Sequence, residues 1–302
     1  MINQWPGSWG YVYRWLDGIT NFDERFQRFA QLKKHFAQVL DQFQPHVLVS
    51  TFPPYPYLLR QIAGQDRSCK SIVVITDSIT VNAIWYQCDA DYFLPSNEPS
   101  AAVVRAAGIS PEKIKVFGFP VSPQFANLEE DRQSRRQSTR PLILCVIHAG
   151  KKRAPELVRK LLELNIELTV AVGHDGRLRD AIGEISHART INIIGWTTEM
   201  PRLLCRSHVL IGKAGGATVQ ETIAAGCPMI VNHVVSGQEE GNARLIAETN
   251  SGVIALEPDE VAAQLRRAFA DGANQWGQWA ANIAKLSRPR AALDIAEFLL
   301  SI

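Results

Sequence analysis

The segment that decides the fold is VLIGKAGGATVQETIAAGCPMIV, residues 209–231. An apolar run ends at Lys213, a tight turn with two glycines follows, and a helical pattern starts near Thr218. A second apolar run, PMIVNH (228–233), closes the segment. A strand, a helix and another strand in this order predict a βαβ unit with parallel strands.

The same alternation of short apolar runs and helical patterns continues along almost the whole chain. The apolar residues of the runs are continuous rather than alternating, which is expected for strands that are covered on both faces. Strands are predicted at 46–50, 71–76, 92–95, 114–118, 142–147, 168–173, 191–195, 209–213, 228–233 and 252–256. Helices are predicted at 23–43, 98–107, 152–164, 217–226 and 239–249. This rhythm predicts an α/β protein with doubly wound parallel sheets.

A boundary between two domains is predicted at NLEEDRQSRRQSTR, residues 127–140, which contains almost no apolar side chain. We predict a first domain at 1–127, a linker at 128–140 and a second domain at 141–302, whose last part, 276–302, can cross back onto the first domain. Four arginines of this stretch either contact phosphate or a membrane, or belong to a solvated linker: Arg132, Arg135, Arg136 and Arg140. Because acidic residues lie directly beside them, we favour the solvated linker.

Composition and charge exclude several classes of protein. The 302 residues carry a formal net charge of only +2, which does not favour binding to nucleic acid. Five cysteines occur without CxxC spacing, so we expect a reducing compartment and neither a disulfide framework nor a zinc site. Leu142–Ile147 is among the longest apolar runs and is too short to span a bilayer, which takes about 20 residues. The start, MINQWPGSWGYVYRW, does not resemble a signal peptide. We therefore expect a cytoplasmic protein, soluble or at most peripheral on the inner face of the membrane.

The glycine-rich turn predicts a site for a diphosphate. Gly215 and Gly216 have no Cβ atom, so backbone N–H groups can approach an anion closely. The helix that follows adds its free N–H groups and the positive end of its dipole. Thr218 can cap this helix or bind phosphate, and Glu221 can accept hydrogen bonds from two ribose hydroxyls. The alternative is that the glycines serve only to turn the chain.

A second polar turn follows the next predicted strand, in SGQEEGNARLIAE (236–248). Amide and carboxylate side chains at Gln238, Glu239 and Asn242 suit the several hydroxyls of a hexose. The alternative is a helix N-cap with its solvated first turn, in which Gly237 is the turn residue. Both turns follow neighbouring parallel strands at their carboxyl ends, where open α/β sheets bind ligands.

Two long stretches resemble a known family. KAGGATVQETIAAGCPMIV (213–231), followed by GQEEGNA (237–243), resembles the C-terminal domain of the diacylglycerol glycosyltransferases, which include the monogalactosyldiacylglycerol synthases. Residues 75–125, from ITDSITVNAIW to FPVSPQF, resemble the N-terminal block of the same family. The lipid-linked N-acetylglucosaminyltransferase of peptidoglycan synthesis is a more distant relative. The resemblance implies the GT-B fold, two Rossmann-like domains with parallel sheets and a cleft between them.

The resemblance also implies a UDP-sugar site built from three turns. The phosphates and ribose would be held by Gly215, Gly216, Thr218 and Glu221. The sugar would be held by Gln238, Glu239 and Asn242. The uracil would lie against the turn that carries Gly195, Trp196 and Thr197. On its own, Trp196 is a packing aromatic rather than a ligand. His174 could touch phosphate, although a solvated loop histidine is the alternative.

The sequence departs from the family in two places that bear on catalysis. The family opens with a strand, a glycine-rich turn and a histidine that deprotonates the acceptor, and this chain has no such turn near its start, so we expect an incomplete first domain. IHAGKKRAPEL (147–157) replaces the glycine-rich loop that opens the second domain, and its basic residues could meet a phosphate or an anionic lipid. Asp77, at the end of a predicted strand, is a candidate for acceptor binding or proton transfer, and a turn cap is its alternative.

We therefore expect a hexosyltransferase that uses UDP-glucose or UDP-galactose, with a lipid acceptor such as diacylglycerol. No cofactor and no metal are expected, because the sequence lacks the paired acids of a metal-dependent mechanism. The aromatic residues near the start favour either a membrane surface or packing within the protein. Two other functions stay open: a catalytically silent or partner-dependent UDP-sugar-binding half, whose partner chain would supply the missing N-terminal unit, and a sugar-nucleotide epimerase.

Overall fold

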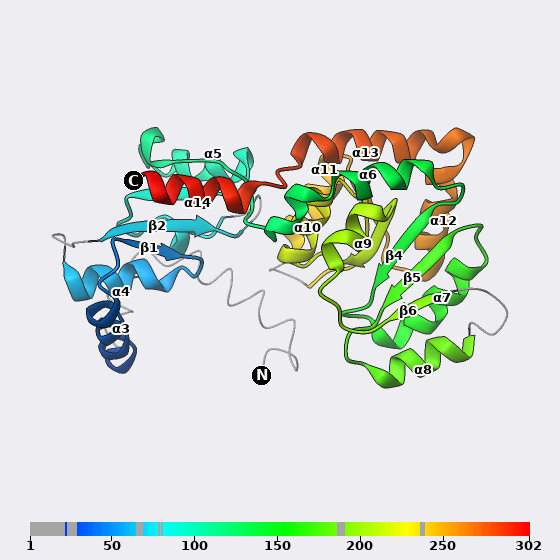
Figure 1. Ribbon diagram of the computed structural model, residues 1–302, viewed down its shortest axis with the longest axis horizontal. Helices are drawn as coiled ribbons and strands as arrows, with labels where there is room; N and C mark the ends of the chain where they lie inside the picture. Colours follow the sequence, from blue (N-terminus) through cyan, green and yellow to red (C-terminus); the bar gives the residue numbers. More distant parts are fainter. Residues whose placement is uncertain are drawn as a thin grey trace. The chain divides into compact units, whose positions relative to one another are not determined.

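The computed structural model describes residues 22, 29–64, 69–77, 79, 81–185, 191–235 and 239–302, without the side chain of Arg136 (Figure 1). Gln238 and the aromatic residues of positions 5–15 lie outside the described residues. The chain divides into two compact units. The first unit comprises residues 1–120, 236–238 and 293–302, and the second comprises 121–235 and 239–292.

The first unit contains a parallel sheet of three described strands in the order β1-β2-β3. The strands are β1 (Val47–Ser50), β2 (Lys70–Ile75) and β3 (Tyr92–Pro95). The helices are α3 (Ala30–Phe43), α4 (Pro54–Ala63), α5 (Glu98–Ala106) and α14 (Ala291–Ser301). Side chains alternate between the two faces of β2, because successive Cβ atoms of a strand point to opposite sides. Both faces are covered, as the continuous apolar pattern predicts.

The two faces of β2 pack against different helices. Val73 and Ile75 lie in a buried cluster with Tyr57 of α4 and Val104 of α5. On the opposite face, a cluster that includes Ile72 and Val74 packs against side chains of α14. Tyr92 and Phe117 add ring contacts with Phe298, at centroid distances of 5.0 and 5.4 Å. Helix α14 is therefore part of the first unit from Leu293 onward, whereas residues 276–292 belong to the second unit.

The second unit is built on a parallel sheet of six described strands in the order β6-β5-β4-β7-β8-β9. The strands are β4 (Leu142–Val146), β5 (Glu167–Ala171), β6 (Asn192–Ile194), β7 (Val209–Lys213), β8 (Met229–His233) and β9 (Gly252–Ile254). The chain runs outward from β4 to β6, returns to the middle and runs outward again from β7 to β9. Adjacent strands β4 and β7 therefore mark the point where the strand order reverses, which is where doubly wound sheets bind ligands.

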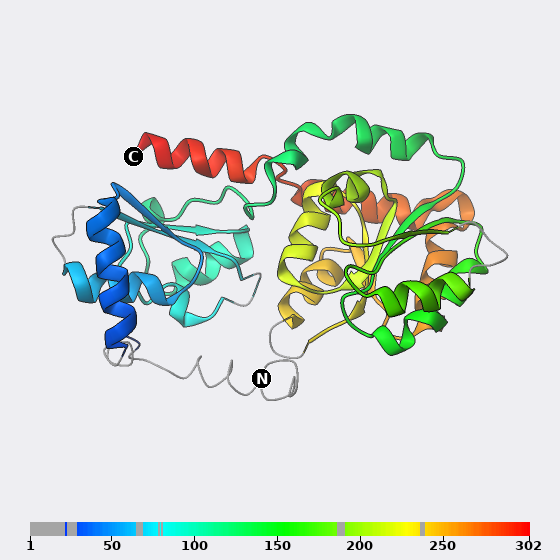
Figure 2. The same cartoon turned by 60° about the horizontal axis from the view of Figure 1, so that its bottom comes forward.

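Helices cover both faces of this sheet (Figure 2). The helices of the second unit are α6 (Glu129–Gln137), α7 (Ala154–Leu162), α8 (Gly176–Ile185), α9 (Met200–Arg206), α10 (Gly216–Ala225), α11 (Glu240–Glu248), α12 (Pro258–Phe269) and α13 (Asn274–Leu286). Leu157 of α7, Ile182 of α8 and Val261 of α12 share one buried cluster with Ile143 and Val170 of the strands. Each βα connection is short, so each strand delivers its last residue and the next helix start to the same edge of the sheet.

Two predictions about regular structure are wrong. The predicted strand at 114–118 contributes one isolated bridge, from Ile114 to Phe93. The predicted linker at 128–140 is largely the helix α6, which packs against α9. Its apolar side chains are too few to bury, and polar contacts attach it instead. Arg135 is 6% exposed and donates to the carbonyl oxygens of Ser207 and Gly226, at 3.1 and 3.0 Å.

The remaining contacts of α6 also differ from those of a solvated linker. Arg132 donates to the carbonyl oxygens of Phe125 and Ala224, at 2.7 and 3.1 Å. Arginine suits this role because its planar guanidinium presents several donors at once. Arg132 and Arg135 thus attach α6 to the second unit.

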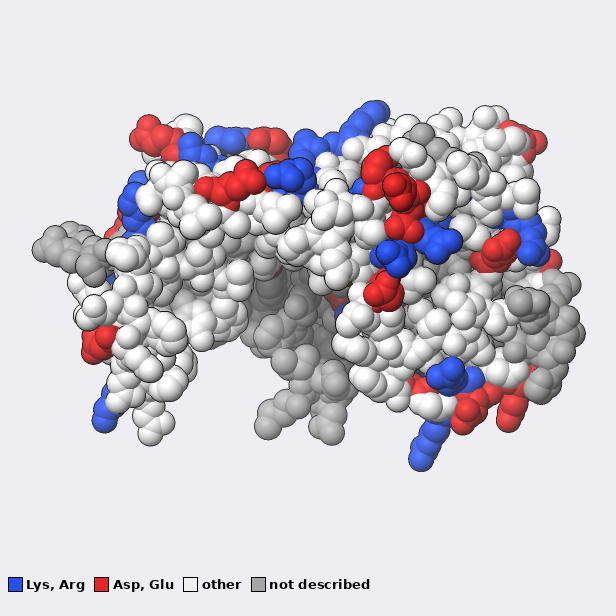
Figure 3. All heavy atoms as spheres, in the orientation of Figure 1, with Lys and Arg blue, Asp and Glu red and all other residues white. Residues whose placement is uncertain are grey.

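The structure also bears on the predictions from composition. All five cysteines are free and buried, and burial raises the pKa of the Cys145 and Cys227 thiols to about 12. Basic and acidic side chains are interspersed on the face shown in Figure 3, in agreement with a net charge of +2. Within the described ranges, no helix combines the length and the apolar character that crossing a membrane requires.

Candidate functional site

The glycine-rich turn lies at the carboxyl end of β7, beside the strand-order reversal. Gly215 is the N-cap of α10 and no side chain caps the helix, so the first N–H groups of α10 have no side-chain acceptor. A Cβ atom on Gly215 would lie 3.2 Å from Cε of Lys213 and 3.6 Å from Oε1 of Glu239. The turn is therefore closely surrounded, and glycine at 215 leaves space that a side chain would occupy.

The second predicted turn contacts the first. Glu239 is 5% exposed, and its Oε1 accepts a hydrogen bond from Nζ of Lys213 at 2.6 Å. Its other oxygen, Oε2, accepts from the backbone N–H of Val235 at 3.0 Å. Nδ2 of Asn242 donates to the carbonyl oxygen of Ala214 at 3.1 Å. These bonds join the start of α11 to the β7–α10 turn, so the two predicted turns lie side by side.

These contacts also revise what each polar side chain can do. Both oxygens of Glu239 already accept a hydrogen bond, and each retains further acceptor capacity. Asn242 uses its amide nitrogen, while its carbonyl oxygen makes no hydrogen bond to the residues that the structure describes. Lys213 is the cation of this group, and the sequence prediction did not include it among the site residues. Its position at the end of a predicted strand, two residues before Gly215, is the local signal that could have identified it.

Glu221 lies on the second turn of α10 and is half-buried. It forms no ion pair and no side-chain hydrogen bond with any described residue. Desolvation raises the pKa of its carboxyl group. Removing a carboxylate partly from water without giving it a hydrogen-bond donor reduces the stability of the folded protein. Hydroxyl groups of a ligand would supply the missing hydrogen bonds. The side chain of Thr218, one turn earlier, likewise makes no hydrogen bond within the described part of the chain.

A second surface lies at the carboxyl ends of β5 and β6. Trp196 is 65% exposed and stacks on His174, with ring centroids 6.0 Å apart and planes inclined by 10°. A Cβ atom on Gly195 would lie 3.3 Å from the carbonyl oxygen of Gly173, so the two loops are in close contact. Oγ1 of Thr197 accepts from the N–H of Glu199 at 3.0 Å, at the start of α9. Trp196 is thus not a core aromatic, because most of its surface is open to solvent.

Asp77, the catalytic candidate, lies in the first unit, after β2. Its Oδ2 accepts a hydrogen bond from the indole Nε1 of Trp85 at 2.8 Å, and its carbonyl oxygen accepts from Oγ of Ser100 at 3.3 Å. Ile79 has a φ of 62°, which is unusual for a β-branched residue, and its N–H also donates to Ser100. The carboxylate is therefore held by an indole, and its role in catalysis stays a prediction.

The structure collects most of the predicted residues at one edge of one sheet. Gly215, Gly216, Thr218, Glu221, Glu239 and Asn242 lie around the carboxyl ends of β7 and β8, and Gly195, Trp196 and Thr197 lie at the carboxyl end of β6. The sequence prediction missed Lys213 and also His148, which follows β4. No group of three or more His, Cys, Asp or Glu residues in the described ranges could hold a metal ion.

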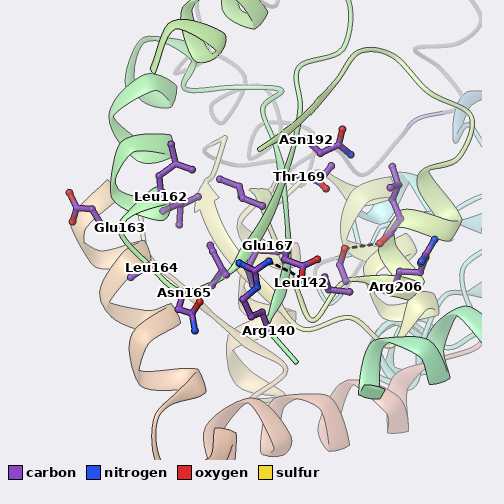
Figure 4. A pocket seen from close by; sticks show the side chains of 16 residues that line it. Arg140, Leu142, Leu162, Glu163, Leu164, Asn165, Glu167, Thr169, Asn192 and Arg206 are labelled. Atoms are coloured by element: carbon purple, nitrogen blue, oxygen red, sulfur yellow. Dashed lines mark hydrogen bonds and ion pairs between the residues drawn. The ribbon is translucent and has the colours of Figure 1, made fainter. Parts of the chain in front are cut away.

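A cavity of about 930 Å³ lies at the opposite edge of the same sheet (Figure 4). It is lined at the amino ends of β4 and β5 by Leu142 and Glu167, and Arg140 pairs with Glu167 across it at 3.3 Å. Open parallel sheets bind ligands at their carboxyl ends. We therefore assign the functional site to the edge that carries the glycine-rich turn rather than to this cavity.

Two family profiles match the chain. Residues 4–121 match monogalactosyldiacylglycerol (MGDG) synthase, and residues 142–292 match the C-terminal domain of glycosyltransferase family 28. The chain belongs to the glycosyltransferases that carry the family 28 C-terminal domain, and its N-terminal part matches the MGDG synthase profile. The second match contains every described residue of the predicted sugar-nucleotide site, and the first contains Asp77.

The individual relatives agree with this family. The MGDG synthase of Spinacia oleracea is 26% identical over 288 residues, which cover 89% of this chain and 55% of that protein. The chain thus spans about half the length of the curated relatives it matches. Crystal structures of MurG from Acinetobacter baumannii and of a UDP-GlcNAc 2-epimerase from Neisseria meningitidis both superpose with a TM-score of 0.66. They are 15% and 13% identical, and they cover 89% and 95% of this chain and 77% and 84% of their own. This likeness confirms the predicted α/β, GT-B fold.

Proposed function

We propose that this protein transfers a hexose from a UDP-sugar to a hydroxyl group of a lipid, and that the lipid is diacylglycerol. The observation that carries the proposal is the contact between the two turns, in which Glu239 and Asn242 are held against the start of α10 by Lys213 and Ala214. This contact places uncapped helix N–H groups, a cation and polar acceptors together at the carboxyl edge of a doubly wound sheet.

The donor fits these groups part by part. The diphosphate would meet the first N–H groups of α10, the hydroxyl of Thr218 and the ammonium of Lys213. The ribose hydroxyls would donate to the carboxylate of Glu221, which accepts no hydrogen bond from the described residues. The uracil would lie at Trp196, because the tips of β6 and β7 are three strand spacings apart, or roughly 14 Å, a length that a nucleoside diphosphate can bridge.

The hexose would lie at the start of α11. Glu239 and Asn242 keep acceptor capacity that sugar hydroxyls can use. Gln238 is predicted to join them. A solved structure with the same fold, the epimerase from Neisseria meningitidis, is bound to UDP-GlcNAc, which supports a UDP-sugar as the class of donor.

The transfer forms one bond and breaks one bond. The acceptor oxygen attacks the anomeric carbon, the bond from that carbon to the diphosphate breaks, and the acceptor proton passes to a base, for which Asp77 is the candidate in the first unit. The departing UDP gains negative charge, which the α10 N–H groups and Lys213 are placed to stabilise. With that charge met by the protein, no metal ion and no further cofactor are required.

Diacylglycerol is proposed because the relatives with this sequence pattern are named for its galactosylated product. Vesicles that contain diacylglycerol, incubated with the protein and labelled UDP-galactose or UDP-glucose, should yield a labelled glycolipid. The same reaction with chelator should proceed at the same rate. If the protein binds the UDP-sugar but transfers it to no lipid, the result would favour the alternative of a catalytically silent or partner-dependent UDP-sugar-binding protein.

The epimerase alternative has its own measurement. Proton NMR of UDP-GlcNAc incubated with the protein should show an unchanged sugar. The appearance of an epimer, together with the absence of labelled lipid, would refute the proposed transfer.

A further inference from the structure

The segment that follows β4, IHAGKKRAPEL at residues 147–157, carries His148 close to the strand end. Its imidazole is exposed and makes no hydrogen bond and no ion pair with any residue that the structure describes. Gly150, with a φ of 67°, then turns the chain into the short helix 151–153 that precedes α7. His148, with no hydrogen-bonding partner among the described residues, thus lies at the reversal point of the sheet.

The strand register places His148 beside the glycine-rich turn. Cys145 of β4 pairs with Ile211 of β7. His148 follows β4 by two residues and Gly215 follows β7 by two residues, so both lie just beyond the carboxyl ends of these neighbouring strands. The two strands are still in contact at their last residues, since a Cβ atom on Gly212 would lie 3.6 Å from the carbonyl oxygen of Val146.

Two lysines flank the imidazole from different elements, and each is already paired. Lys213 of β7 is bound to Glu239 of α11 at 2.6 Å, and Lys151 is bound to Asp175, after β5, at 2.7 Å. Both acidic partners are therefore engaged with lysines rather than with the imidazole. The pKa of His148 lies below its usual value of 6.5. The largest cause is partial desolvation of the imidazole, followed by the positive charges of Lys213 and then Lys151. In the empty site the imidazole is consequently uncharged at neutral pH.

We propose that His148 takes up a proton when the diphosphate of a UDP-sugar binds beside it, so that a neutral side chain in the empty site becomes a cation that contacts the bound diphosphate. The inference rests on the proposed function, because it needs a diphosphate at this edge of the sheet. The two negative charges of the ligand offset the two lysines and favour the protonated imidazole. The affinity for the donor then depends on pH through a residue of the β4–α7 segment.

The test is calorimetry of UDP-galactose binding without acceptor, at about pH 7 and in two buffers of different ionisation enthalpy. The diphosphate of a UDP-sugar is esterified at both ends and does not titrate in this range, so any proton taken up binds to the protein. The wild-type protein should take up protons on binding, at most one per ligand. Its affinity should rise by up to about tenfold for each unit by which the pH falls from 8 towards 6.5.

Three variants complete the design. His148→Gln should bind UDP-galactose more weakly at about pH 6.5 and take up no proton. His148→Lys, which is charged throughout, should bind without proton uptake and with little dependence on pH. His35→Gln, at an exposed position of α3, is the matched control and should behave as the wild type.

The outcomes separate this inference from the function on which it rests. Binding of UDP-galactose by the wild type without proton uptake, or uptake that persists in His148→Gln, would overturn the role of His148 and leave the donor site standing. Failure of the folded wild type to bind UDP-galactose at any pH would overturn the proposed function itself.

Discussion

Replacement of Glu239 by glutamine removes one charge and keeps the shape of the side chain. In the native protein, two donors approach its two oxygens, Nζ of Lys213 at 2.6 Å and the N–H of Val235 at 3.0 Å. A glutamine has one oxygen and one NH2 group, so it can accept from one donor and must turn its own NH2 group towards the other. The variant therefore loses a charge-assisted hydrogen bond and leaves one donor without its acceptor.

The structure sets the size of this effect. Glu239 is 6% exposed at its side chain and Lys213 is 30% exposed, so the pair is largely shielded from water at the acidic end and partly hydrated at the basic end. Breaking a fully buried ion pair costs about 3–5 kcal/mol. For this half-hydrated pair we expect about 2 kcal/mol, which corresponds to a melting temperature lower by roughly 4–8 °C for a unit of this size.

Thermal and urea unfolding measure the change, and the neighbouring Glu240→Gln provides the matched control. Glu240 is exposed, so its variant should lie within about 0.5 kcal/mol of the wild type. In a Lys213→Met background, Glu239→Gln should lower the free energy of unfolding by less, because the glutamine oxygen then has only the N–H of Val235 to accept from. Equal stabilities of the Glu239→Gln and Glu240→Gln proteins would refute the claim that Glu239 joins the two turns.

Three further predictions concern single positions. Gly252→Ala should destabilise the second unit by more than about 2 kcal/mol in urea unfolding, because its Cβ atom would clash with the carbonyl oxygen of Met229. The control is Gly277→Ala, which should be neutral or stabilising because nothing lies within 4 Å of the added Cβ atom. Burial, and to a smaller extent Arg135, lower the pKa of His208 from 6.5 to about 4, so the unfolded state binds the proton more readily than the folded state. The free energy of unfolding should therefore be highest above pH 6.5 and fall by up to about 3 kcal/mol as the pH drops towards 4. A urea midpoint that does not change over this pH range would contradict the prediction. Trp196→Ala should keep the melting temperature, since the side chain is 65% exposed, and lower the affinity for UDP by about tenfold in calorimetry; unchanged affinity would remove Trp196 from the site.

Much of the second unit could be predicted from its sequence because its signals are local. The helix predicted at 217–226 is α10, at Gly216–Ala225, and the one predicted at 239–249 is α11, at Glu240–Glu248. Continuous apolar runs identify buried parallel strands wherever both faces are covered. The two turns follow consecutive strands, so their contact could be inferred before any side chain was placed.

The errors have physical causes that local patterns do not carry. Helix α6 has almost no apolar face and is held by arginines that reach carbonyl oxygens about 70 to 90 residues away along the chain. No periodicity reports such contacts, so the segment was predicted to be a linker. The run 114–118 is apolar enough for a strand, but only Ile114 pairs.

The site shows the same division between local and distant information. The glycines and Glu221 could be selected from their spacing along one βα turn. Lys213 and His148 acquire their significance from strand adjacency and from charges on other elements, such as Glu239 opposite Lys213. The placement of His148 beside the glycine-rich turn required the order in which the strands lie in the sheet.

Hydrogen–deuterium exchange, measured with and without saturating UDP, tests the central claim most directly. The backbone amides at the start of α10 lack side-chain caps, and bound phosphate would become their acceptor. We predict slower exchange in peptides that cover 213–221 and 239–242, and no change around the cavity at 161–169. Binding of UDP that protects residues 161–169 and leaves 213–221 unchanged would show that the donor site lies elsewhere.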